Sequence, residues 1–79
     1  MSCRAEFMIE PFEEGAPGHH VMAAIDAVRD RGFEPEVGPF GTSIHGDPAT
    51  VIAALQAMLA TAYREGATRV SLQLERDEA

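Results

Sequence analysis

Polar side chains that can pair with a ligand are concentrated in one short stretch near the middle of the chain. Thr42, Ser43 and His45 supply two hydroxyl groups and an imidazole. Gly41 and Gly46 flank them, and a glycine lets another molecule approach the backbone closely. Hydroxyls both donate and accept hydrogen bonds, and an imidazole changes its charge near neutral pH. The stretch therefore indicates a binding surface for a small ligand.

The same residues contain the elements of a catalytic triad, with Ser43 as nucleophile, His45 as base and Glu10 as orienting acid. Covalent catalysis requires the nucleophile and the base within hydrogen-bond reach. Residues two apart on one strand face lie about 7 Å apart, and no glycine loop that would form an oxyanion hole accompanies them. A phosphate-binding loop like that of an acylphosphatase is missing too, since Glu13 and Glu14 follow the first predicted strand. We expect no catalytic residues, and a hydrolase remains the alternative.

A metal site is a second alternative, because the chain has three histidines and one cysteine. His19 and His20 are sequential and project about 100° apart on a helix, so they do not face one ion together. Cys3 and His45 have no neighbour at ligand spacing. We predict no metal and no cofactor, and we interpret the paired histidines as a solvated first helical turn.

One aromatic residue stands apart from the predicted core. Phe12 follows Pro11 at the end of a predicted strand, in a segment rich in glycine, proline and acids. An exposed ring in such a loop commonly covers a pocket or an interface. Phe40 belongs to the apolar alternation of its strand and is also near enough to Thr42 to lie against a ligand ring.

Composition narrows the classes of partner. The formal net charge of −7 comes from thirteen acidic residues against six arginines, and it argues against nucleic acid or an anionic membrane as a partner. No apolar run approaches the roughly 18 residues of a membrane span. A single cysteine fits a reducing compartment, so we expect a cytoplasmic protein. The 79 residues predict one domain, 1–79, which is small enough to gain stability from self-association.

Six elements must position these side chains. Apolar and polar residues alternate with the period of a strand over residues 3–10, 33–37, 40–46 and 70–75. Apolar residues recur at helical spacing over residues 19–31 and from Asp47 to Gly66. Asp47-Pro48 is a typical helix start, and Pro35 makes its strand an edge strand. The order predicts an α+β fold, a ferredoxin-like βαββαβ sandwich whose four-stranded antiparallel sheet carries both helices on one face.

The alternation also predicts which side chains face the helices and which face away. The expected helix-facing residues are Phe7, Ile9, Phe40, Ile44, Val70, Leu72 and Leu74. The open face is expected to carry Glu6, Met8, Glu10, Ser43, His45, Ser71 and Gln73. Because Met8 lies among polar groups there, this face is compatible with partial burial against a second subunit.

Several segments together resemble the small thiamine-binding, YkoF-like protein family. They are the runs 5–12 and 37–47, the helix end Arg31-Gly32-Phe33 and the closing Arg69-Val70 strand. The most specific feature is the Gly-Pro-x-Gly-Thr-x-x-x-Gly pattern at Gly38 to Gly46. The resemblance implies a ferredoxin-like fold, assembly as a homodimer or homotetramer, and non-catalytic binding of thiamine or its hydroxymethylpyrimidine moiety.

An aminopyrimidine suits this chemistry, because it offers a ring acceptor and an amine donor that hydroxyls can pair with in a desolvated cleft. The predicted ligand-binding residues are Thr42, Ser43, His45, Glu10, Phe12 and Phe40. Carboxylates would attract the thiazolium cation of thiamine, and a phenylalanine ring can lie against a ligand ring. The alternative is an oligomeric regulatory protein of the same fold with a different ligand or none.

Overall fold

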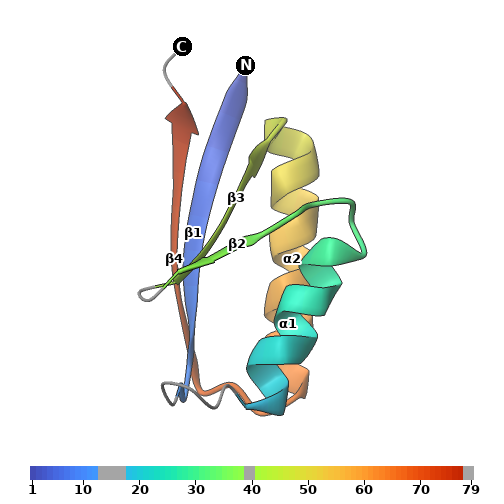
Figure 1. Cartoon of the computed structure of the whole chain (residues 1–79), viewed down its shortest axis with the longest axis vertical. Helices are drawn as coiled ribbons and strands as arrows, with labels where there is room; N and C mark the ends of the chain where they lie inside the picture. The colour runs from blue at the N-terminus through green and yellow to red at the C-terminus, as the bar shows by residue number, and fades with distance from the viewer. Residues whose placement is uncertain (13–17, 39–40, 78–79) are drawn as a thin grey trace.

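A computed structural model describes residues 1–12, 18–38 and 41–77. The elements follow the order β1 (Ser2–Glu10), α1 (His19–Arg29), β2 (Glu36–Gly38), β3 (Gly41–Gly46), α2 (Pro48–Arg64) and β4 (Arg69–Asp77). The strands form one sheet in the order β2-β3-β1-β4, and each adjacent pair is antiparallel. Figure 1 shows both helices packed against a single face of this sheet. The predicted ferredoxin-like α+β fold is therefore confirmed.

The second helix begins and ends where its sequence signals stand. Asp47 accepts a hydrogen bond from the Thr50 backbone N–H at 3.3 Å, and Pro48 occupies the first turn. At the other end Gly66 adopts a φ of 112°, and the Ala67 N–H donates to the Ala62 carbonyl at 2.9 Å. A side-chain cap satisfies a free N–H at the start, and a left-handed glycine lets the chain leave the last turn. No helix within the described residues is long and apolar enough to cross a membrane.

The core lies between the helices and the sheet. The helix-facing side chains of β1 alternate with half-buried ones, and Ala5 and Phe7 are almost inaccessible to solvent. The buried apolar residues from the helices are Val21, Ala24, Ile25, Val28, Val51, Ala54, Leu55, Met58 and Ala62. Alanines among them let the two helices approach each other and the sheet closely.

The strand predicted over 33–37 is shorter and later than expected, because β2 covers only Glu36–Gly38. Phe33 packs against the core instead, and its ring approaches Gly46 so closely that a side chain there would lie 3.2 Å from it. Pro35 has no N–H to donate to a strand ladder. The segment before Glu36 therefore covers the end of the core. Pro39 and Phe40, where the predicted strand 40–46 begins, lie outside the described residues.

Two of the predicted helix-facing residues, both on β4, are partly exposed. Leu72 and Leu74 pair with Phe7 and Ala5 of β1, so they do face the helix side. They nevertheless retain 40% and 44% of their accessible surface, whereas Phe7 retains 1%. The predicted orientation is confirmed, and the exposure arises because β4 is an edge strand that reaches beyond the cover provided by the helices.

Candidate functional site

A cavity of about 310 Å³ opens between α1 and one end of the sheet. We call it the helix-side cavity. Its lining residues come from β1 and the residues after it, from α1, and from the β2–β3 pair: Phe7, Met8, Ile9, Phe12, Val21, Met22, Ile25, Arg29, Val37, Gly38, Gly41 and Thr42. The volume is at the lower end of the range for ligand pockets and suits a single small ring system.

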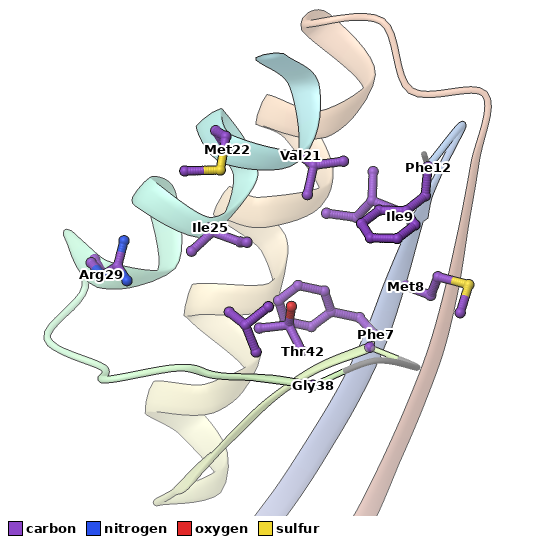
Figure 2. Close-up of a pocket in the computed structure, with 12 residues that line it drawn as sticks. Phe7, Met8, Ile9, Phe12, Val21, Met22, Ile25, Arg29, Gly38 and Thr42 are labelled. Atoms are coloured by element: carbon purple, nitrogen blue, oxygen red, sulfur yellow. The ribbon is translucent and has the colours of Figure 1, made fainter. Parts of the chain in front are cut away.

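Thr42 places a hydroxyl group in this apolar setting. It pairs with Phe7 across β3 and β1, so its side chain points toward the helices, and the residue is 6% exposed. Figure 2 shows its oxygen directed into the space between the sheet and Ile25. Among the described residues, no hydrogen bond to the Thr42 side chain is formed. A hydroxyl at the wall of an apolar cavity can donate to or accept from a ligand that enters the cavity.

Phe12 covers one end of the cavity beside Ile9 and Val21 (Figure 2). Its ring stays 46% exposed, as the sequence suggested for a loop aromatic. The preceding residue is held in place by α1, because His20 Nε2 donates a hydrogen bond to the Pro11 carbonyl oxygen at 2.6 Å. The histidine at this first turn is thus not simply solvated, which corrects that part of the sequence interpretation.

Arg29 is the only charged side chain among the described residues that line the cavity. Its guanidinium contacts Asp26 at 3.4 Å and Glu34 at 3.8 Å, and the side chain is 47% exposed. Exposed pairs of this kind contribute little stability, about 0–1 kcal/mol. They do reduce the positive charge at the cavity mouth, while the interior remains apolar.

Three of the predicted site residues lie on the opposite face of the sheet. Ser43 pairs with Glu6, and His45 pairs with Arg4, which places both on the open face. Glu10 is four positions along β1 from Glu6 and lies 3.8 Å from the Arg69 guanidinium. The nucleophile, base and acid of the hypothetical triad are therefore not brought together. None of the three lines the helix-side cavity, and Phe40 lies outside the described residues.

The sequence analysis missed the contribution of α1. Val21, Ile25 and Arg29 follow one another at intervals of four residues, so they share one face of the helix. The sequence analysis predicts the helix but assigns none of its residues to the site, whereas the structure places Arg29 beside the same cavity as Val21 and Ile25. The four-residue spacing of Val21 and Ile25, extended by one helical turn, is the sequence signal that indicates Arg29.

Other reactive groups lie apart from the cavity. Cys3 is a buried free thiol, and burial raises its pKa, with further contributions from Asp77 and Asp47. A raised pKa lowers the thiolate fraction and with it the reactivity of the thiol. Within residues 1–12, 18–38 and 41–77, no cluster of three His, Cys, Asp or Glu side chains could hold a metal ion.

Comparison with known proteins identifies the family to which this fold and sequence belong. The fold defines a small ferredoxin-like α+β protein with a cavity between its first helix and its sheet. A sequence model described as thiamine-binding protein matches residues 5–79. The chain belongs to the thiamine-binding protein family. No curated protein matches it significantly.

Solved structures share the fold at low sequence identity. A proposed thiamine biosynthesis or salvage protein from Thermotoga maritima has a TM-score of 0.72 and 19% identity, covering 98% of this chain and 85% of that one. A hypothetical protein from Methanocaldococcus jannascii has a TM-score of 0.71 and 26% identity, with coverage of 99% and 80%. A domain of unknown function from Bacillus cereus has a TM-score of 0.70 and 20% identity, with coverage of 95% and 73%. These similarities establish the fold.

Proposed function

We propose that the chain is a non-enzymatic binding protein for thiamine or its hydroxymethylpyrimidine moiety, and that the ligand occupies the helix-side cavity. The family supports a thiamine-related small molecule. The observation that carries the choice of site is the position of Thr42, a residue 6% exposed, whose hydroxyl lies at the wall of a cavity that is apolar apart from Arg29. One oriented polar group within an apolar pocket is the usual design of a small-ligand site.

The pyrimidine ring is the part of thiamine that fits the interior. Phe7 and Phe12 offer apolar ring surfaces, and the Thr42 hydroxyl can donate to a ring nitrogen or accept from the exocyclic amine. Backbone groups around Gly38 and Gly41 also border the cavity. A site that hydrogen-bonds a ring discriminates strongly against an apolar ring of the same shape.

The thiazolium ring fits less well inside. It carries a positive charge, and none of the described lining residues carries a carboxylate, whereas Arg29 carries a like charge. Burying an unpaired cation in apolar surroundings is costly. In the proposed complex the thiazolium therefore lies at the mouth, within reach of the carboxylates of Asp26 and Glu34 that flank Arg29.

The absence of catalysis is part of the proposal. Nucleophilic catalysis requires a base beside the nucleophile, and the described residues that line the cavity include no histidine, cysteine or carboxylate beside Thr42. We also propose that residues 1–79 act as one cytoplasmic binding domain that assembles as a homodimer or homotetramer. The small size of the chain supports assembly, because a domain of this length buries a limited core.

Titration calorimetry tests the proposal with three compounds: thiamine, free hydroxymethylpyrimidine and the isolated thiazole alcohol. We expect saturable heat with the first two, similar dissociation constants for both, and much weaker binding of the thiazole alcohol. Recovery of unaltered ligand by mass spectrometry checks that no turnover occurs. No heat from either pyrimidine compound at millimolar concentration would instead support the regulatory alternative.

A further inference from the structure

Phe12 lies at one end of the helix-side cavity, just beyond the sheet that orders the rest of the wall. It is the second residue after β1, and its ring lies beside Ile9 and Val21 (Figure 2). A side chain that is 46% exposed stays at such a wall only where the backbone before it is fixed. A contact residue that must first be ordered weakens binding, because the freedom it loses opposes association. The anchoring of Phe12 therefore bears on affinity.

Two tethers hold the backbone immediately before Phe12, and they come from different elements. His20, in the first turn of α1, donates from Nε2 to the Pro11 carbonyl oxygen at 2.6 Å. Thr68, in the connection between α2 and β4, donates to the Glu10 carbonyl oxygen from its backbone N–H at 2.8 Å and from its hydroxyl at 3.3 Å. Each of the two carbonyl groups that precede Phe12 is thus held by hydrogen bonds.

The residue before α1 leaves room for the His20 ring. A Cβ on Gly18 would lie 2.6 Å from His20 Cε1 and 2.8 Å from Nδ1, so the ring occupies the space that a side chain would need. The φ of Gly18 is −68°, which any residue adopts, so the backbone conformation does not require glycine. Gly18 is also the helix N-cap and gives no side-chain hydrogen bond, although serine, threonine, asparagine and aspartate are preferred there. This helix start favours the placement of His20 over a side-chain cap.

We propose that His20 is a positioning residue of the binding site. Its hydrogen bond to Pro11 holds the Phe12 ring against the cavity and so raises the affinity for the ligand, although His20 is not among the described residues that line the cavity. The proposal rests on the proposed binding of a ligand in the helix-side cavity. It adds a residue whose effect on that ligand passes through Phe12.

His19 provides a matched comparison. It is the neighbouring residue in the same helical turn, and its Nε2 lies 2.8 Å from a Glu65 carboxylate oxygen at the end of α2. This contact joins the two helices, whereas the contact of His20 joins α1 to the residues after β1. Removing either histidine deletes one short contact from the start of α1, but only the loss of His20 releases the backbone before Phe12. The pair therefore separates positioning from a general effect on the helix.

Calorimetric titration with hydroxymethylpyrimidine tests the proposal. We expect His20→Ala to raise the dissociation constant by about five- to tenfold, because the Phe12 ring must then be ordered on binding. His20→Gln keeps a side-chain N–H donor and is expected to bind within about threefold of the unaltered chain. His19→Ala is expected to bind as the unaltered chain does, and urea denaturation checks that all three variants fold. Unchanged binding by His20→Ala, or no recovery in His20→Gln, would overturn the proposal.

A double-mutant cycle tests whether His20 acts through Phe12. Phe12→Ala removes the ring and is expected to raise the dissociation constant by about tenfold. Without the ring His20 has nothing to position, so adding His20→Ala to Phe12→Ala is expected to change the constant by less than about twofold. Losses that add fully would show that His20 affects binding by another route, which contradicts the proposal.

A measurement without ligand separates this proposal from the proposed function. The chain contains no tryptophan, so Phe12→Trp introduces a single fluorophore at the end of the cavity. In that background His20→Ala is expected to increase acrylamide quenching and to lower the fluorescence anisotropy, whereas His19→Ala is expected to change neither. Absence of heat from the unaltered chain contradicts the proposed function. Unchanged fluorescence in the His20→Ala variant contradicts the positioning role, whether or not the ligand binds.

Discussion

The helix-facing side of the sheet and its open side both carry hydroxyl-bearing residues, but they offer them to different surroundings. Thr42 is buried beside Phe7 and lines a cavity, whereas Ser43 is half-buried on the other face opposite Glu6. The two are adjacent in the chain and differ by one methyl group. Their difference in surroundings arises from strand geometry alone, because successive side chains leave a strand on opposite faces. A hydroxyl on the enclosed side can pair with a ligand away from bulk water. On the open side, a ligand must compete with water for the hydroxyl.

The largest expected contrast between the faces is in stability. Phe7 is 1% exposed at the centre of the helix-facing side, and its replacement by alanine is expected to cost about 3–5 kcal/mol of unfolding free energy. Glu6 is its neighbour on the open side, and Glu6→Ala is expected to cost less than about 0.5 kcal/mol. Urea denaturation followed by circular dichroism measures both. Equal losses would mean that the two faces are not distinct in packing.

A smaller effect is expected where β3 enters the sheet. A Cβ on Gly41 would lie 2.9 Å from the Phe7 carbonyl oxygen, so Gly41→Ala must displace backbone and is expected to cost about 1–3 kcal/mol. A Cβ on Gly38 would meet its nearest atom at 3.5 Å, an ordinary contact, and Gly38→Ala should leave the urea midpoint almost unchanged. Both glycines border the cavity. A similar loss of stability from both substitutions would therefore show that the contact with the Phe7 carbonyl oxygen is not the cause.

Much of the contrast between the two faces of the sheet could be predicted from the sequence. The alternation in residues 3–10 and 40–46 indicated which side chains share a face, and Asp47-Pro48 and Gly66 marked the second helix. The cavity could not be predicted, because its volume depends on how far α1 stands from the sheet at Phe7 and Ile25. The exposure of Leu72 and Leu74 was missed for a related reason, since it depends on how far the helices extend over the sheet edge.

The sequence analysis grouped Thr42 with Ser43 and His45 because they are close in the chain. The two-residue period of a strand places Thr42 on the other face. The same period had already placed Ser43 and His45 on the open side, and the structure has them there. Whether any of these residues binds a ligand stays a prediction. Arg29 could not be assigned to the site from the sequence, because a charged residue at the end of an apolar helical stripe is usually exposed to solvent.

Blocking the cavity mouth should weaken binding without disturbing the fold. Met22 and Ile52 are each 44% exposed on a helix, but only Met22 lines the cavity. Met22→Trp is expected to raise the dissociation constant for hydroxymethylpyrimidine by about thirtyfold, or about 2 kcal/mol, because the larger ring occupies the entrance. Ile52→Trp is the matched control and should bind as the unaltered chain does. If both variants bind equally well, the ligand site is elsewhere.

The most direct test compares the two adjacent hydroxyls by calorimetric titration with hydroxymethylpyrimidine. Thr42→Val keeps the shape of the side chain and removes its hydroxyl, so binding should weaken by about tenfold, while Ser43→Ala should leave the dissociation constant unchanged. The opposite result, unchanged binding by Thr42→Val and loss by Ser43→Ala, would move the site to the open face of the sheet and contradict the account.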